Sequence, residues 1–405
     1  MNEKRSQARK LVNGYFLVEG LNSFATTLYF YYIYWFTGQT FGFTQVQNFL
    51  LAAAIGLIYG VASVLGGRFA QRRGYFSALK LGCAVMALAI APGAFILSLP
   101  VHCIIVFIGV CGMALTWPSL EALVSEGDAP EHLPRNIGIY NLVWAASGAL
   151  AYFLGGSMIK AWSFRSLFLV PAAIFVLQLV IIALLERAKR LQPQPAHHAL
   201  PSALPDEEEG ERSRSPVPPI TFLRMAWLAN PLAYLTIGTV VAVIPALANN
   251  LKLSVAWAGI ICSIWQFVRA GSFVVLWQWK GWHYRFRWLV AAYVAMAASF
   301  VTILIAPSLA VIIVAQIFFG LGTGLIYYSS LYYSMHVGEA RGDHGGVHEG
   351  MIGVGSCAGP AISAASLHLL PSHANSGAVA VAMVLFGGWG ALMWLRYSKR
   401  RPITA

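Results

Sequence analysis

Charged residues are scarce in this sequence. Only 10% of its 405 residues are charged, whereas 58% are hydrophobic, and the mean hydropathy is +0.66. A soluble domain carries about 25% charged residues, so the composition excludes a water-soluble globular protein. Lipid must surround most of the chain.

Reactive and ligand-binding patterns are also missing. The five cysteines all lie inside apolar runs and none forms a CxxC pair, so we interpret them as small core residues rather than disulfides or metal ligands. No GxxxxGK[ST] loop is present to hold ATP phosphates, and no Ser-His-Asp order stands out. We therefore expect neither an enzyme nor an ATP-driven pump, with no cofactor and no bound metal.

Long apolar runs fill the rest of the chain. A spanning helix needs roughly 20 mostly apolar residues. Twelve segments meet this length, and they are 14–36, 45–66, 77–98, 101–123, 137–159, 165–186, 226–249, 255–277, 286–306, 309–333, 347–369 and 375–396. The sequence thus predicts an all-α membrane protein with twelve transmembrane helices in two six-helix bundles.

A polar segment separates the two sets of six. Residues 187–220 contain seven prolines and the acidic run Asp206-Glu207-Glu208-Glu209. Such a segment cannot bury a core, so we expect a flexible, solvated cytoplasmic linker. The predicted domains are an N-terminal bundle over 1–186, this linker over 187–220, and a C-terminal bundle over 221–405.

The basic residues indicate the orientation in the membrane. The net charge of +12 would suit a nucleic-acid partner, but the basic residues are confined to breaks between apolar runs, where they set topology. A cytoplasmic N-terminus puts 23 of the 27 Lys and Arg residues inside, leaving Lys160, Arg165 and Lys252 outside and Arg269 within a helix. We expect both termini to be cytoplasmic, in a bacterial inner membrane, and no nucleic-acid partner.

The two halves of the chain echo each other weakly. Gln71-Arg72-Arg73-Gly74-Tyr75 is matched 207 residues later by Gln278-Trp279-Lys280-Gly281-Trp282, and both fall between the second and third helix of their half. Ser119-Leu120 is matched in the same way by Ser330-Leu331, late in the fourth helix of each half. A six-helix unit used twice is the pattern of a transporter whose halves face a midplane cavity.

With these two halves and the loop between its second and third helices, the chain resembles the major facilitator superfamily. The loop between helices 2 and 3 of that family has the form G-x-x-x-D-R/K-x-G-R/K, and here Gly67, Arg72 and Gly74 match it, while Gln71 and Tyr75 depart from it. The resemblance implies a loop that latches the cytoplasmic ends of the two bundles in one state. Gln71 can hydrogen-bond but cannot supply the charge of the family's acidic residue, and the alternative is a basic loop that only sets topology.

The resemblance and the helix ends together define an expected cytoplasmic gate. Its members are Gly67, Gln71, Arg72 and Gly74 in the first loop, Gln278, Lys280 and Gly281 in the second, and Glu121, Glu126, His348 and Glu349 at the ends of helices 4 and 11.

Helix 11 carries a second resemblance. The segment 355–364 is similar to the G-x-x-x-G-P pattern that facilitator antiporters carry in their fifth helix, and here Gly355, Gly359 and Pro360 match it. Because the pattern is in a different helix, antiport does not carry over. We expect instead that these residues bend the helix and allow tight packing at the interface between the halves.

Very few charged residues lie well inside the predicted spans, and residues of this kind usually face a cavity. Glu19, Asn22, Thr26 and Tyr29 share one stripe of the first helix, which lines the central cavity in facilitators. This stripe is a candidate substrate or proton path, with Glu19 as the protonatable group. The alternative is a carboxylate that reaches the nearby membrane surface.

Arg269 is the one basic residue well inside a predicted span. It is a candidate to hold an anionic substrate, or to pair with Glu19 in one state of the cycle. The alternative is a structural ion pair or a side chain that reaches the interface. Gln266 shares its helix face, and the further aromatic and amide candidates, each also explicable as packing or an interfacial belt, are Trp117, Asn141, Trp144, Gln316, Tyr328 and Tyr332.

These features favour a monomeric secondary transporter that moves a small organic solute by alternating access, coupled to protons. Its partners would be the solute, protons and the lipid bilayer. Two alternatives within transport are an uncoupled uniporter and a drug-type exporter. From another class, the chain could be a transporter-like receptor that senses a solute without moving it.

Overall fold

The computed structural model describes residues 2–125, 133–191, 217–306, 308–337 and 344–398, and every regular element in these ranges is a helix. In chain order they are α1 (Asn2–Phe41), α2 (Gln45–Arg73), α3 (Tyr75–Ile90), the 3-10 helix η1 (Ala91–Ala94), α4 (Leu99–Ser125), α5 (Leu133–Trp162), α6 (Arg165–Arg190), α8 (Pro219–Asn250), α9 (Val255–Cys262), α10 (Ile264–Gln278), α11 (Phe286–Ile305), α12 (Leu309–Val337), α13 (His344–Leu369) and α14 (Ser376–Ser398).

All twelve expected spans fall on helices. Eleven stretches of the described chain are long and apolar enough to cross a membrane, with α9 and α10 counted together. The twelfth span, 14–36, lies within the 40-residue α1, whose tyrosines and polar residues lower its hydropathy. The least apolar spanning helix is therefore the one that carries the stripe of polar candidates.

Two spans differ in detail from the expectation. The third was expected over 77–98, but α3 ends at Ile90 and gives way to η1, because Pro92 has no N–H to donate and disfavours helix in the residue before it. The eighth is divided at Ser263, whose hydroxyl donates to the Ile260 carbonyl oxygen at 2.7 Å. Serine bonds of this kind bend helices.

Local chemistry sets where α2 begins and ends. At its start the Thr44 hydroxyl accepts from the Gln47 N–H at 3.3 Å, and the Gln47 side chain accepts from the Thr44 N–H at 2.8 Å, which forms a capping box. At its end Gly74 takes φ +91°, a conformation that strongly favours glycine. The turn between α2 and α3 is therefore fixed by the second glycine of the family loop.

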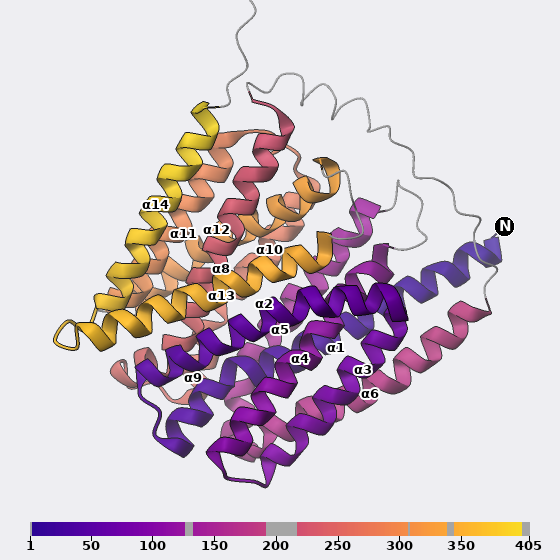
Figure 1. The fold of residues 1–405 in the computed structure, drawn as a ribbon, viewed down its shortest axis with the longest axis horizontal. Coiled ribbons are helices and arrows are strands. Elements are labelled where there is room, and N and C mark those ends of the chain that lie inside the picture. The colour runs from indigo at the N-terminus through magenta and orange to yellow at the C-terminus, as the bar shows by residue number, and fades with distance from the viewer. Residues whose placement is uncertain (1, 126–132, 192–216, 307, 338–343, 399–405) are drawn as a thin grey trace, which may run out of the picture.

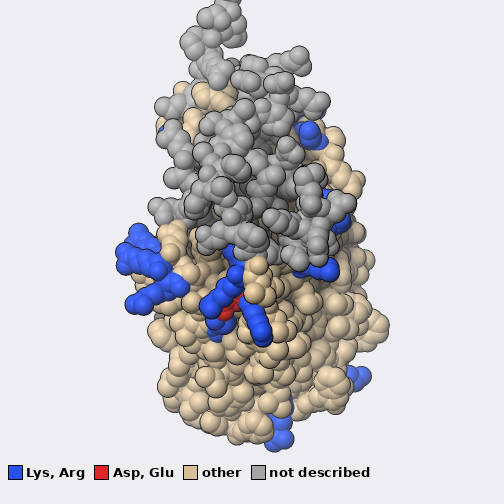
Figure 2. Space-filling view, turned by 90° about the vertical axis from the view of Figure 1, so that its right-hand side faces the viewer, with Lys and Arg blue, Asp and Glu red and all other residues tan. Residues whose placement is uncertain are grey.

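The helices form two groups that lie side by side. Helices α1–α6 occupy one side of the molecule and α8–α14 the other (Figure 1). Contact between the groups runs mainly through α2 against α13 and through α5 against α9 and α10. In Figure 2 Lys and Arg side chains lie across the middle and along the upper right of the face, and a few more lie near its lower end.

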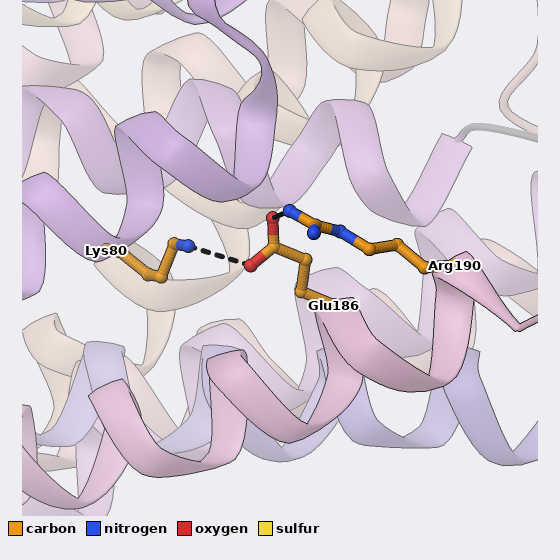
Figure 3. Close-up of polar contacts among 3 residues, drawn as sticks. All are labelled: Lys80, Glu186 and Arg190. Atoms are coloured by element: carbon orange, nitrogen blue, oxygen red, sulfur yellow. Dashed lines mark hydrogen bonds and ion pairs between the residues drawn. The ribbon is translucent and has the colours of Figure 1, made fainter.

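An ion-pair cluster ties α3 to α6 within the N-terminal group. Glu186 accepts from Lys80 at 2.7 Å and from Arg190 at 2.8 Å (Figure 3). Lys80 and Arg190 are both partly exposed, so each pair is worth roughly 0.2–1 kcal/mol. The cluster fixes neighbouring helix ends and lies away from the interface between the groups.

Glycines bring α2 and α13 into direct backbone contact. A side chain on Gly353 would meet the backbone of Gly60, and one on Gly56 would meet the backbone of Cys357. Gly355 and Gly359 lie against the carbonyl groups of Pro231 and Leu235 in α8. They are on a different face of α13 from Gly353, because residues two apart in a helix point in nearly opposite directions. The expected G-x-x-x-G-P packing thus occurs inside the C-terminal group rather than between the halves.

The α2–α13 contact yields a stability prediction. Gly353→Ala should lower the melting temperature of the purified protein, because overpacking of a close contact costs about 1–3 kcal/mol. Gly271→Ala in α10 is the matched control, since a side chain there would meet nothing within 4 Å. Equal melting temperatures for the two variants would contradict close packing at Gly353.

Candidate functional site

A central cavity of about 180 Å³ lies between the two groups of helices. Helices α1, α2, α4 and α5 line it from one side, and α8, α10, α12 and α13 line it from the other. Its wall is largely aromatic, with a few hydroxyl and amide groups and three charged residues, Glu121, Arg269 and Glu349. A concave, mostly apolar site with few convergent polar groups is the usual form of a small-molecule site.

Arg269 of α10 is enclosed by aromatic rings. The guanidinium carbon lies 4.7 Å from the ring centre of Trp144 in α5 and 4.9 Å from that of Tyr327 in α12. Tyr234 and Phe273 lie at 5.6 and 5.7 Å, and the Tyr234 hydroxyl accepts from Nη2 at 3.1 Å. The two nearest rings come from different halves, so this cation links them through its contacts with π-systems.

No carboxylate pairs with Arg269 among the described residues. Its side chain is 5% exposed, and Nε has no hydrogen-bond partner there. The expected pair with Glu19 is not formed in this conformation, because the Glu19 carboxylate accepts a hydrogen bond from Trp117 instead. A buried guanidinium with free donors is costly unless a ligand supplies the acceptor.

Glu349 of α13 binds across the interface. Its carboxylate accepts a hydrogen bond from the Tyr59 hydroxyl of α2, and both side chains are buried and line the cavity. The bond joins residues 290 positions apart in the chain. Glu349 is thus part of the cavity wall and of the contact between halves at once.

Three glutamates gather around the same end of the site. Glu121 of α4 is half-buried, lines the cavity, and interacts electrostatically with both Glu349 and Glu19. Glu19 is fully buried behind the wall, where its Oε1 accepts from the Trp117 indole at 3.1 Å and its Oε2 has no partner among the described residues. Like charges this close, away from water, repel one another strongly.

The polar stripe of α1 lies beside the cavity rather than along it. Thr26 lines the cavity, whereas the Asn22 amide donates to Thr116 at 3.3 Å inside the N-terminal group. Tyr29 packs edge-on against Phe168, away from the cavity. The residues of α1 that do line it are Ser23, Thr26, Thr27, Phe30, Tyr31 and Tyr34.

The other expected pathway residues divide in the same way. Trp117, Trp144 and Gln266 line the cavity with Arg269. Asn141 and Gln316 are buried outside its lining, and none of their amide atoms has a partner among the described residues. Tyr328 and Tyr332 pack against Trp282, and Tyr332 shares a 3.0 Å hydrogen bond with His283. These two tyrosines belong to the packing beneath the α10–α11 turn.

The expected gate residues fall into two places. The loop members lie at or near the exposed ends of their helices, and they are Gly67, Gln71, Arg72, Gly74, Gln278, Lys280 and Gly281. Glu121 and Glu349 line the central cavity, and buried His348 lies with its ring 5.5 Å from that of Tyr327. Glu126 lies outside the described residues.

Six tyrosines of the cavity wall were not expected from the sequence. They are Tyr31, Tyr34, Tyr59, Tyr140, Tyr234 and Tyr327. On α1 the signal was present, because Ser23, Thr27, Tyr31 and Tyr34 follow helical spacing one position beyond the stripe of Glu19. On α2 and α8 a lone tyrosine in an apolar run gives no sign of the direction it faces, and on α5 and α12 the sequence does not distinguish Tyr140 and Tyr327 from the other tyrosines of the same helix.

Comparison with known proteins decides the family. The model of the Major Facilitator Superfamily matches residues 15–360 of the chain. The chain belongs to the major facilitator superfamily. It is accordingly a multi-pass membrane transporter and not an enzyme. No curated protein matches the chain by sequence.

Solved structures of major facilitator transporters share the fold. A bacterial homologue of the human lysosomal transporter Spinster, inward-facing and occupied, has a TM-score of 0.66 and 15% identity, covering 96% of this chain and 95% of its own. The human organic anion transporter MFSD10 has a TM-score of 0.66 and 16% identity, covering 96% and 99%. A POT family transporter in complex with a thioalcohol-conjugated peptide has a TM-score of 0.75 and 13% identity, covering 96% of both chains.

The bond between Tyr59 and Glu349 gives a testable contribution to stability. Tyr59→Phe should lower the melting temperature, because a buried carboxylate that loses a hydrogen bond costs about 1–3 kcal/mol. Tyr31→Phe is the matched control, since Tyr31 also lines the cavity but its hydroxyl makes no hydrogen bond within the described chain. If both variants melt at the wild-type temperature, Tyr59 does not hold Glu349.

Proposed function

We propose that this major facilitator protein is a secondary transporter that moves a small organic solute by alternating access, coupled to protons. One observation carries the proposal. Among the described residues, one cavity walled by helices of both halves holds two glutamates and a buried arginine that pairs with no carboxylate. A site built from both halves changes its exposure when the halves move against each other.

The contact between the halves suits such motion. At Gly60 and Gly353 the contact of α2 with α13 is made by glycines and backbone, so no long side chains interlock there. Gly156 of α5 likewise lies against the backbone of Val255 at the start of α9. Close contacts without interlocking side chains let helices move against each other at a small cost in free energy. A ligand that binds one conformation more tightly in the cavity then favours that conformation.

The glutamates supply sites for the coupling proton. Glu19, Glu121 and Glu349 lie near one another in an enclosure of aromatic side chains. Because three negative charges there would repel one another, proton binding relieves the repulsion. Glu349 has the most direct route to motion, since its hydrogen-bond partner Tyr59 belongs to the other half.

The charge pattern and the cavity support a proposal for orientation and assembly. We place both termini in the cytoplasm of a bacterial cell with the protein in the inner membrane, because most Lys and Arg residues then lie inside. The two halves complete the cavity within one chain, so we expect a monomer to be sufficient.

Transport assays on reconstituted protein test the coupling. A solute is first identified by thermal shift among sugars, nucleosides, amino acids, carboxylates and amphiphilic drugs. A pH gradient of one unit should then drive up to about tenfold accumulation of that solute per coupled proton. In Glu349→Gln and Glu19→Gln this accumulation should fall, while solute counterflow without a gradient continues.

Glu186→Gln is the matched control, because Glu186 pairs with Lys80 and Arg190 away from the cavity. It should keep wild-type accumulation. Wild-type accumulation in Glu349→Gln, in Glu19→Gln and in a variant lacking Glu19, Glu121 and Glu349 together would contradict proton coupling. Binding of a solute that never crosses the membrane would instead favour a receptor over a transporter.

A further inference from the structure

We propose that the solute is an organic anion whose acid group binds Arg269, and that it crosses the membrane together with protons in the same direction. This inference rests on the transport function proposed above and names its substrate class and coupling sense. Three features support it: the free donors of Arg269, the aromatic rings around it, and the glutamates that share its cavity.

The hydrogen-bonding capacity of Arg269 points to an anion. A guanidinium has five N–H donors and no acceptor. Within the described chain only the Tyr234 hydroxyl accepts from it, Nε has no partner, and no carboxylate lies within ion-pair distance. The side chain nevertheless lines the cavity while only 5% exposed. A carboxylate or similar acid group in the cavity would satisfy the donors and neutralise the charge, as bidentate pairs do.

The aromatic enclosure argues against a cationic solute. Rings such as those of Trp144 and Tyr327 would otherwise attract an ammonium group through their π faces. Here the guanidinium of Arg269 already lies 4.7 and 4.9 Å from these two ring centres. A second cation beside it would meet like charge, so this part of the wall selects anions. The remaining aromatic surface, including Tyr31 and Tyr34, accepts an apolar body.

The glutamates give the sense of coupling. When Glu121 and Glu349 are ionised, the wall carries two negative charges against the one positive charge of Arg269, and an anion is repelled. Protons on the glutamates remove that repulsion, so proton binding strengthens anion binding. By linkage, anion binding strengthens proton binding to the same degree. Two ligands that favour each other in one cavity move together, whereas a cation would compete with the protons and be exchanged for them.

Matched ligands of one skeleton test the inference. We would measure thermal shifts and affinities for 3-phenylpropanoate, 3-phenylpropanamide, 3-phenylpropylamine and the zwitterion phenylalanine, with a parallel set of pentanoate, pentanamide and pentylamine. The wild-type protein should bind at least one acid about tenfold or more tightly than its amide and amine. The affinity for the acid should rise from neutral to acidic pH.

Variants assign the effect to the named residues. Arg269→Gln should remove the preference for the acid over the amide, and Arg269→Lys, which keeps the charge but loses the planar fork, should retain part of it. The double variant Glu121→Gln, Glu349→Gln should bind the acid with little dependence on pH. Arg165→Gln is the control, since Arg165 lies against Phe95 outside the cavity lining. If Arg269→Gln does not fold, the preference of Arg269→Lys for the acid over the amide tests the assignment instead. A reduced preference supports the role of Arg269, and an unchanged preference contradicts it.

The outcomes separate this inference from the transport function. Preference for the amide, the amine or the zwitterion, absence of any shift with both acids, or acid binding that Arg269→Gln leaves unchanged would each overturn the anion assignment. Acid binding that weakens at acidic pH would overturn the coupling sense. Counterflow of whichever compound binds would still establish transport, so an incorrect substrate class would not be mistaken for an incorrect function.

Discussion

The structure depends on keeping one cation out of lipid. A charge at the centre of a spanning helix costs about 2.5–3.5 kcal/mol on insertion scales, so it must face a protein interior. Arg269 meets this constraint by lying against rings from both halves of the chain, Trp144 and Tyr327, which stack on each other with ring centres 5.1 Å apart. The contact that shelters the charge is also a contact between halves, so we propose that a ligand bound to Arg269 acts on their relative position.

The glycine contacts and the glutamate cluster complete this arrangement. Gly60 and Gly353 bring α2 and α13 together without interlocking side chains, and the bond from Tyr59 to Glu349 crosses the same pair of helices. In the proposed function, a proton on Glu349 would act on the contact of α2 with α13, and an anion on Arg269 would act on the contact of α5 with α10 and α12. We propose that binding and motion are coupled because the binding groups are themselves part of the interface.

The sequence was sufficient for the fold, because lipid requires long apolar helices and their lengths can be read directly. It also indicated Arg269 and Glu19, since charges inside apolar runs are rare. It could not show that Glu349 lies in the cavity, because its position near the start of a helix is equally suited to a gate. Nor could it show that Tyr59 faces Glu349, since that depends on how two helices 290 residues apart are rotated.

Spin-label distances across the two ends of the molecule test alternating access most directly. One pair of labels would replace exposed Arg73 and Arg287, at the end of α2 and the start of α11, and another pair would replace exposed Leu97 and Leu370, in the turns at the opposite end. Measured by electron double resonance with and without a transported solute, the two distances should change in opposite directions. Unchanged distances, or two ends that open together, would contradict the account.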